Sequence, residues 1–220
     1  MVGTSGAPVY RLFGPSWSDA GTGLYGSTVS DVTTVAGVTL ASARGAGFGP
    51  VSVYAGGASA AGCGDVRALA GAGASGGPAP AASATVLAAS SCDVTAFTLS
   101  NGSITGSASA ASGLPTGVSP TTLARVADGS VAGGTDSAGM WRYVGSSWTS
   151  DNSGLSGSEP ILATRQVGSP LFASTGTVLL QRQALGWQAG QGRHADGSCQ
   201  QAEQLSSLHQ GKISGRSQVS

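Results

Sequence analysis

Charged side chains are scarce in this sequence: Asp, Glu, Lys and Arg make up 9% of its 220 residues, where a soluble domain averages about 25%. The ten basic and ten acidic residues cancel to a formal net charge of zero, and Lys212 is the single lysine. Proteins that bind nucleic acid or an anionic membrane surface concentrate basic charge on one face. The sequence therefore predicts no nucleic-acid partner and no electrostatic attachment to a membrane.

Long apolar runs, a leader and a metal-binding cysteine pattern are missing as well. No apolar run approaches the roughly eighteen residues of a membrane-spanning helix, and residues 1–14 have neither the basic start nor the apolar core of a signal peptide. The three cysteines, Cys63, Cys92 and Cys199, do not have the spacing of metal ligands. A Cys63–Cys92 disulfide and free structural thiols both remain open, so the sequence leaves the cellular compartment undetermined.

Small residues dominate what is present. Glycine accounts for 37 of 220 residues, and Ala, Ser, Thr and Val supply most of the remainder. Disordered chains combine low hydropathy with high net charge, whereas the mean hydropathy here is +0.13. Short alternating apolar runs are separated by Gly, Ser, Asn and Asp, which is the pattern of strands and turns. We therefore expect an all-β fold.

One segment occurs twice. Residues 140–155, MWRYVGSSWTSDNSGL, match residues 9–24, VYRLFGPSWSDAGTGL, 131 positions earlier. The identities are Arg11 with Arg142, Gly14 with Gly145, Ser16 with Ser147, Trp17 with Trp148, and Gly23-Leu24 with Gly154-Leu155. A duplication of this kind indicates an internal repeat.

Weaker copies of the repeat recur about every 40–45 residues. Apolar pairs followed by small residues place alanines at 41, 88, 132 and 173, which are 41 to 47 residues apart. Such a period, with three or four short strands in each unit, is typical of β-propeller blades, whose sheets stack face to face around an axis. Small residues suit strands that are crowded near the axis, and we expect the tryptophan and the Gly-Leu pair to anchor the outer strand and the crossing to the next unit.

We predict a β-propeller-like repeat domain over residues 1–187. It contains a partial unit at 1–24 and four units at about 25–57, 58–113, 114–155 and 156–187. Residues 188–220 are rich in Gln and Ser and are predicted to form a polar, disordered tail with a short helix over residues 200–209. A short propeller, a ring that a homo-oligomer completes and a truncated sequence all remain open.

Residues 123–155 resemble a blade of the BNR/Asp-box and related sensor-type propellers. The matching parts are an Asp-Gly turn at 128–129, a strand ending at Gly134-Thr135, a turn at 137–139, an aromatic strand at 140–143, and Trp148. The likeness is weak over 58–113, and the full motif Ser-x-Asp-x-Gly-x-Thr-Trp is met only in fragments, over residues 16–23. The resemblance implies a propeller fold.

Asp-box propellers include sialidases, so the resemblance also implies an arginine triad for a substrate carboxylate. Arg11, Arg142 and Arg182 occupy comparable positions, as the repeat alone would produce. Glycosidases need a pair of acids, whereas the chain has two glutamates, Glu159 and Glu203, and its aspartates lie in turn-like contexts. The sequence favours a protein that is not an enzyme, with no catalytic residue and no cofactor.

Aromatic and arginine side chains of the repeat are the candidate ligand-binding residues, because aromatic rings stack on sugars. They are Tyr10, Arg11, Trp141, Arg142 and Tyr143. The alternative is that these rings are packed between units. The two histidines lie in the predicted tail without a third ligand, so no metal site is predicted.

Three functions remain open. The first is a non-catalytic β-propeller-like repeat protein that binds a carbohydrate or protein ligand through its loops. The second is a structural β-repeat component of a virion or surface fibre, and the third is a sialidase-like glycoside hydrolase. The scarcity of acids favours the first of these over the third.

Overall fold

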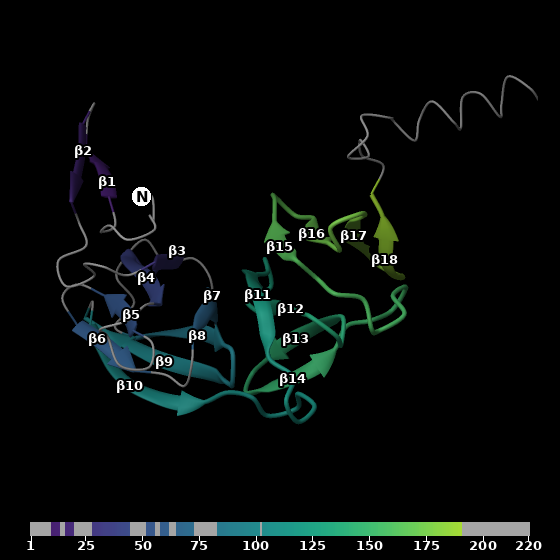
Figure 1. Ribbon diagram of the computed structural model, residues 1–220, viewed down its shortest axis with the longest axis horizontal. Helices are drawn as coiled ribbons and strands as arrows, with labels where there is room; N and C mark the ends of the chain where they lie inside the picture. The colour runs from purple at the N-terminus through teal and green to yellow at the C-terminus, as the bar shows by residue number, and fades with distance from the viewer. Residues whose placement is uncertain are drawn as a thin grey trace, which may run out of the picture.

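The computed structural model describes residues 10–13, 16–19, 28–44, 52–55, 58–61, 65–72, 83–101 and 103–190, and every regular element in them is a β-strand (Figure 1). Sixteen strands form four antiparallel sheets in which consecutive strands are neighbours, and two more form a separate hairpin. The hairpin is β1 (Tyr10–Phe13) and β2 (Ser16–Asp19). The sheets contain four strands each, and we number them 1 to 4 in chain order.

The strands of each sheet have the following bounds. Sheet 1 is β3 (Thr28–Val35), β4 (Val38–Arg44), β5 (Ser52–Ala55) and β6 (Ala58–Ala61). Sheet 2 is β7 (Val66–Ala72), β8 (Ala84–Ser90), β9 (Val94–Ser100) and β10 (Ser103–Ser109). Sheet 3 is β11 (Pro120–Arg125), β12 (Val131–Thr135), β13 (Met140–Val144) and β14 (Ser147–Ser150). Sheet 4 is β15 (Ala163–Gln166), β16 (Leu171–Ser174), β17 (Leu179–Gln183) and β18 (Gly186–Ala189).

Short turns with positive φ angles connect several of the strands. Ala36 and Gly37 have φ values of 49° and 77° between β3 and β4, which is the conformation that two-residue hairpins require. Between β11 and β12, Asp128 Oδ1 accepts a hydrogen bond of 2.9 Å from the Ser130 N–H, and Gly129 has a φ of 86°. The Asp-Gly pair of the sequence motif therefore forms the turn between two strands.

Three apolar cores lie between successive sheets, so sheets 2 and 3 bury both of their faces. Alternate residues along a strand point to opposite faces, and neighbouring residues such as Val86 and Leu87 accordingly enter different cores. The largest members are Leu40, Leu69, Phe97 and Leu99 in the first core, Leu87, Leu123, Tyr143 and Trp148 in the second, and Met140, Ile161, Leu171, Leu180 and Trp187 in the third.

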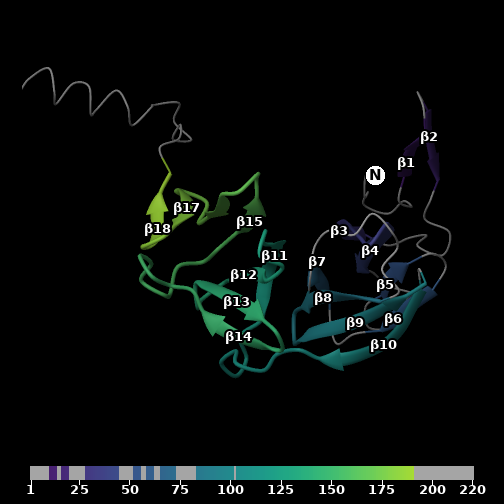
Figure 2. The same cartoon turned by 180° about the vertical axis from the view of Figure 1, so that it is seen from behind.

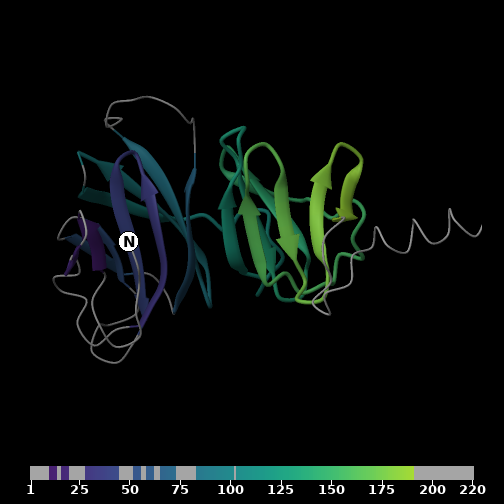
Figure 3. The ribbon, with the colours of Figure 1, turned by 90° about the horizontal axis from the view of Figure 1, so that it is seen from above.

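The first strands of the sheets lie side by side: β3 contacts β7, β7 contacts β11, and β11 contacts β15. The sheets thus follow one another in a curved row that begins with sheet 1 and ends with sheet 4 (Figures 2 and 3). This arrangement places the first strands on the inner side of the row.

The all-β prediction is confirmed, and no closed barrel or propeller ring occurs within the part of the chain that the structure describes. Strand β6 extends sheet 1 past residue 57, where we expected the first unit to end. Strand β18 continues to Ala189, beyond the expected end of the repeat domain. The predicted tail from residue 191 onwards, with its short helix, lies outside the described residues.

Strand β12 is crowded on both faces, as its small residues suggested. A Cβ atom at Gly134 would clash with Ile161 and would lie 2.8 Å from Thr122 Cγ2, whereas a Cβ atom at Gly106 on β10 would meet no atom within 4 Å. We expect Gly134→Ala to lower the free energy of unfolding by about 1–3 kcal/mol through overpacking.

The matched substitution Gly106→Ala should change stability by less than about 0.5 kcal/mol, because nothing lies close to the added methyl group. Urea unfolding of the two variants measures both effects. Equal destabilisation by the two substitutions would contradict the crowding of β12.

Candidate functional site

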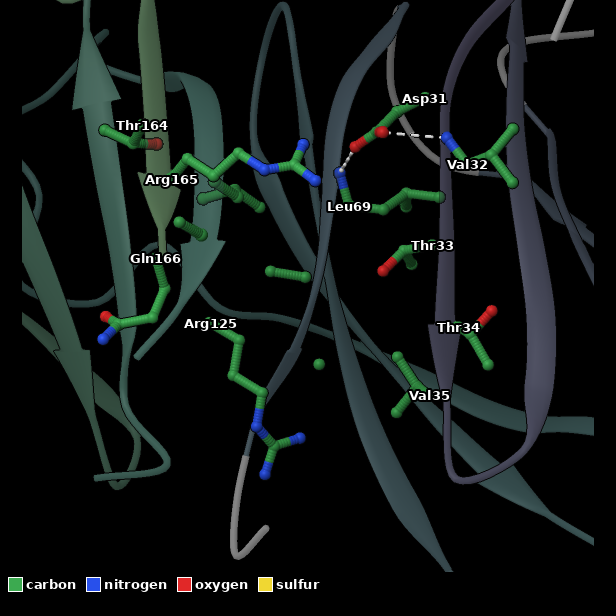
Figure 4. Close-up of a pocket in the computed structure, with 14 residues that line it drawn as sticks. Asp31, Val32, Thr33, Thr34, Val35, Leu69, Arg125, Thr164, Arg165 and Gln166 are labelled. Carbon is green, nitrogen blue, oxygen red and sulfur yellow. Dashed lines mark hydrogen bonds between the residues drawn. The ribbon is translucent and has the colours of Figure 1, made fainter. Parts of the chain in front are cut away.

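A cavity of about 320 Å³ lies among the first strands of the four sheets (Figure 4). It is lined by residues 31–35 of β3, 69–71 of β7, 123–125 of β11 and 164–166 of β15. Since these strands are far apart in the sequence, the cavity exists only when all four sheets are in place. Its polar side chains come from different sheets, which is an arrangement that can surround a ligand.

Asp31 joins the first two sheets at one side of the cavity. Its Oδ2 atom accepts a hydrogen bond of 2.7 Å from the Leu69 N–H on β7, and its Oδ1 atom accepts one of 2.8 Å from the Val32 N–H (Figure 4). Burial of the carboxyl raises the pKa of Asp31 above its ordinary value of 3.8; the two N–H donors and the positive charge of Arg165 oppose this rise only in part. The carboxyl group is therefore held in place and is easier to protonate than a solvated one.

Two arginines supply the positive charge of the cavity. Arg165 is exposed on β15 and directs its guanidinium group toward Asp31 and Leu69, on the opposite side of the cavity (Figure 4). Arg125 is half-buried at the end of β11. A Cβ atom at Gly71 would lie 3.2 Å from Arg125 Nη1, so the absence of a side chain at position 71 leaves room for this guanidinium.

Threonine hydroxyl groups fix the opposite side of the cavity. Thr164 is buried on β15, and its Oγ1 atom lies 3.0 Å from Thr122 Oγ1 on β11. The Thr164 N–H also donates a hydrogen bond of 3.1 Å to Thr122 Oγ1. These bonds hold β15 in register beside β11. They therefore also place Arg165, the residue that follows Thr164 on β15.

The ionisable side chains that line the cavity are two guanidinium groups and one carboxylate. Guanidinium groups bind carboxylates through paired, charge-assisted hydrogen bonds. A carboxylate held like that of Asp31 suits a hydroxyl or ammonium group of the same ligand. The cavity is thus equipped to hold a small molecule that carries an acid group together with hydroxyl groups.

The predicted residues Trp141, Arg142 and Tyr143 lie on β13 and do not line this cavity. The Trp141 indole N–H donates a 2.9 Å hydrogen bond to the Ala138 carbonyl. The Tyr143 ring is buried with its centroid 5.3 Å from that of Trp148, and Tyr143 also lines a second cavity of about 460 Å³ against sheet 2. Tyr10 and Arg11 belong to β1, and their side chains lie outside the described residues.

Arg142 takes part in a chain of ion pairs between sheets 3 and 4. Its Nη1 atom lies 3.0 Å from Asp128 Oδ2, and its Nη2 atom lies 3.6 Å from Asp151 Oδ2. Asp151 Oδ1 lies 2.9 Å from Arg182 Nη2 on β17. Two of the arginines that occupy comparable positions in the repeat, Arg142 and Arg182, therefore meet at one aspartate between two sheets.

Sequence reasoning missed Asp31, Arg125 and Arg165 as site residues. Each lies in one of the predicted repeat units, and each is a charged residue among apolar and small ones. A charged residue at the first strand of three units is the signal that could have indicated a shared site. These three residues do not form a motif with a fixed spacing in the sequence, because they meet only through the arrangement of the sheets.

No protein-family model and no curated protein matches the sequence. None of the described residues forms a helix that could cross a membrane, and no group of three or more His, Cys, Asp or Glu side chains among them is placed to hold a metal ion. Cys92 is disulfide-bonded, and Cys63, whose pairing with Cys92 the sequence leaves open, lies outside the described residues.

The raised pKa of Asp31 makes stability depend on pH with a definite sign. The folded state holds the Asp31 proton more tightly than the unfolded state, so this contribution to stability is fully present below pH 3.8 and is lost as the pH rises through the folded-state value. We therefore expect the free energy of unfolding of Asp31→Asn, relative to that of the unmodified protein, to be higher at pH 7 than at pH 3. Urea unfolding at the two pH values measures this difference.

Asp128 provides a control of opposite sign. The hydrogen bond from the Ser130 side chain lowers the pKa of Asp128, so its contribution to stability is present above pH 3.8 and is lost as the pH falls through the folded-state value. The free energy of unfolding of Asp128→Asn, relative to that of the unmodified protein, should therefore be lower at pH 7 than at pH 3. A shift of the same sign in both variants would show that neither effect comes from the named carboxyl group.

Proposed function

We propose that this protein is a non-catalytic β-propeller-like repeat protein that binds a small carboxylate-bearing ligand in the cavity between its first strands. The observation that carries the proposal is the placement of Arg125 and Arg165 around one cavity of about 320 Å³ that also contains the half-buried carboxyl group of Asp31. An acidic sugar has the required acid and hydroxyl groups. The cavity, rather than the loops or β13, is the binding site in this proposal.

Two repeated features support the propeller-like part of the proposal. The pairing between the first and second strands shifts register near the start of the first strand in sheets 1, 2 and 3. The shifts lie between Val29 and Asp31, Val66 and Ala68, and Pro120 and Thr122. Bulges are local features that bend a strand and re-aim its side chains, so their recurrence indicates that the sheets share one design.

The hydroxyl groups of two bulged residues make equivalent contacts with the next sheet. Ser30 Oγ donates a hydrogen bond of 2.5 Å to the carbonyl of Val66, at the start of β7. Thr121 Oγ1 donates one of 3.2 Å to the carbonyl of Ile161, which precedes β15. The same bond thus positions the first strand of the following sheet in two places along the row.

The ionisable groups of the cavity support binding rather than hydrolysis. Glycoside hydrolysis by the common mechanisms uses two carboxyl groups on either side of the scissile bond, and the described lining contains the carboxyl group of Asp31 alone. The alternative of a structural β-repeat component rests on association between copies, and the observation that favours it is the uncovered side of sheet 4, where Leu179 is exposed.

Binding of an acidic sugar tests the proposal. We expect isothermal titration calorimetry to detect glucuronate binding and to show glucose binding at least about tenfold more weakly, because glucose has no acid group for the arginines. Arg165→Gln should weaken glucuronate binding by about tenfold or more.

Arg67→Gln is the matched control, because Arg67 is exposed on β7 and does not line the cavity. Its Nη1 atom lies 3.4 Å from Asp136 Oδ2. It should leave glucuronate binding unchanged. Equal binding of glucose and glucuronate, or equal losses in the Arg165 and Arg67 variants, would overturn the assignment of the cavity as a carboxylate site.

A further inference from the structure

Sheets 2, 3 and 4 end in the same way. The residue after the fourth strand donates its N–H to the carbonyl of the first residue of the third strand. The donors and acceptors are Ala110 and Val94 at 2.7 Å, Asp151 and Met140 at 2.9 Å, and Gly190 and Leu179 at 2.7 Å. Ala110, Asp151 and Gly190 are therefore equivalent positions.

In sheets 2 and 3 this position receives a tryptophan from the following sheet. The Trp148 indole N–H donates a 2.7 Å hydrogen bond to the Ala110 carbonyl, and the Trp187 indole N–H donates one of 2.8 Å to the Asp151 carbonyl. Each tryptophan also donates its backbone N–H to the carbonyl of the residue two positions after Ala110 or Asp151. The distances are 2.8 Å from Trp148 to Ser112 and 2.7 Å from Trp187 to Ser153.

Sheet 4 has the same acceptor, but no tryptophan side chain that the structure describes lies on it. The Gly190 carbonyl accepts no hydrogen bond from any residue that the structure describes. The adjacent apolar residue is uncovered as well: Val94 and Met140 are 0% exposed beneath the next sheet, whereas the equivalent Leu179 is 47% exposed. The end of sheet 4 is thus an unfilled copy of a contact that is made twice in this chain.

The hairpin β1–β2 has the sequence and register of the missing element. Its Trp17 is paired with Leu12, next to the last pair Phe13–Ser16. Trp148 is paired in the same way with Tyr143, and Trp187 with Arg182. The hairpin also begins the segment that matches residues 140–155. Within the chain, however, β1–β2 lies at the end of the row that contains β3, and β18 lies at the other end (Figures 1 and 2).

We propose that the β1–β2 hairpin of a second copy of this chain binds the uncovered end of sheet 4. The Trp17 indole N–H of one copy donates to the Gly190 carbonyl of the other, and the hairpin covers Leu179. Because the donor and acceptor surfaces differ, this contact is heterologous and joins copies head to tail into rings or filaments.

Two substitutions test the two surfaces separately. Trp17→Phe removes the indole N–H from the hairpin, and Leu179→Glu places a charge on the uncovered face of sheet 4. Sedimentation velocity from micromolar to millimolar concentration should show association of the unmodified chain, with the dissociation constant raised at least about tenfold in each variant. Leu185→Glu is the matched control, because Leu185 is 89% exposed in the turn at the far end of β18, and it should associate like the unmodified chain.

A mixture of the two variants distinguishes this contact from general association. The Trp17→Phe chain keeps an intact sheet 4, and the Leu179→Glu chain keeps an intact hairpin, so the mixture should form a one-to-one dimer that does not grow further. Thermal unfolding of each variant, followed by circular dichroism, should match the unmodified chain and so exclude loss of the fold.

Three results would overturn the proposal. One is an unmodified chain that stays monomeric over the whole concentration range. Another is association that survives in both variants, and the third is a mixture that remains monomeric although each variant is folded.

Discussion

The bond between a tryptophan and the end of the preceding sheet is the contact on which this structure depends. A buried indole N–H must have an acceptor, and Trp148 and Trp187 each find one in a backbone carbonyl just past a fourth strand. Side chains on Gly113 and Gly154 would collide with the carbonyl oxygens of these tryptophans. Both glycines have positive φ angles, of 91° and 86°. Glycine is therefore required at both positions by the lack of space and by the backbone conformation.

This contact acts at the outer strands, and its consequence appears at the inner ones. Once the fourth strand of a sheet is fixed to the sheet before it, the apolar faces between them close, and the first strands are brought side by side. The cavity depends on that alignment of β7, β11 and β15, and on the hydrogen bond from the Leu69 N–H that joins Asp31 of sheet 1 to β7. Its affinity for a ligand would therefore depend on residues in the cores as well as on its own lining.

Local patterns in the sequence carry the fold, and they could be predicted for that reason. Each of these patterns involves only a few neighbouring residues: the alternation of apolar and polar residues, the turn at Asp128-Gly129, and the repeated Trp and Gly-Leu positions. The site could not be predicted in this way, because Asp31 and Arg165 lie more than a hundred positions apart and meet only through the order of the sheets. The candidates Trp141 and Tyr143 pack in the core between sheets 2 and 3, and Arg142 pairs with Asp151, which in turn pairs with Arg182 of sheet 4.

Hydrogen exchange of the tryptophan indoles tests the account most directly. In protein with ¹⁵N-labelled tryptophan, the indole protons of Trp148 and Trp187 should exchange as slowly as the most protected backbone amides, because both open only when adjacent sheets separate. Rapid exchange of these two indoles, in a protein whose strand amides remain protected, would contradict the claim that they join the sheets.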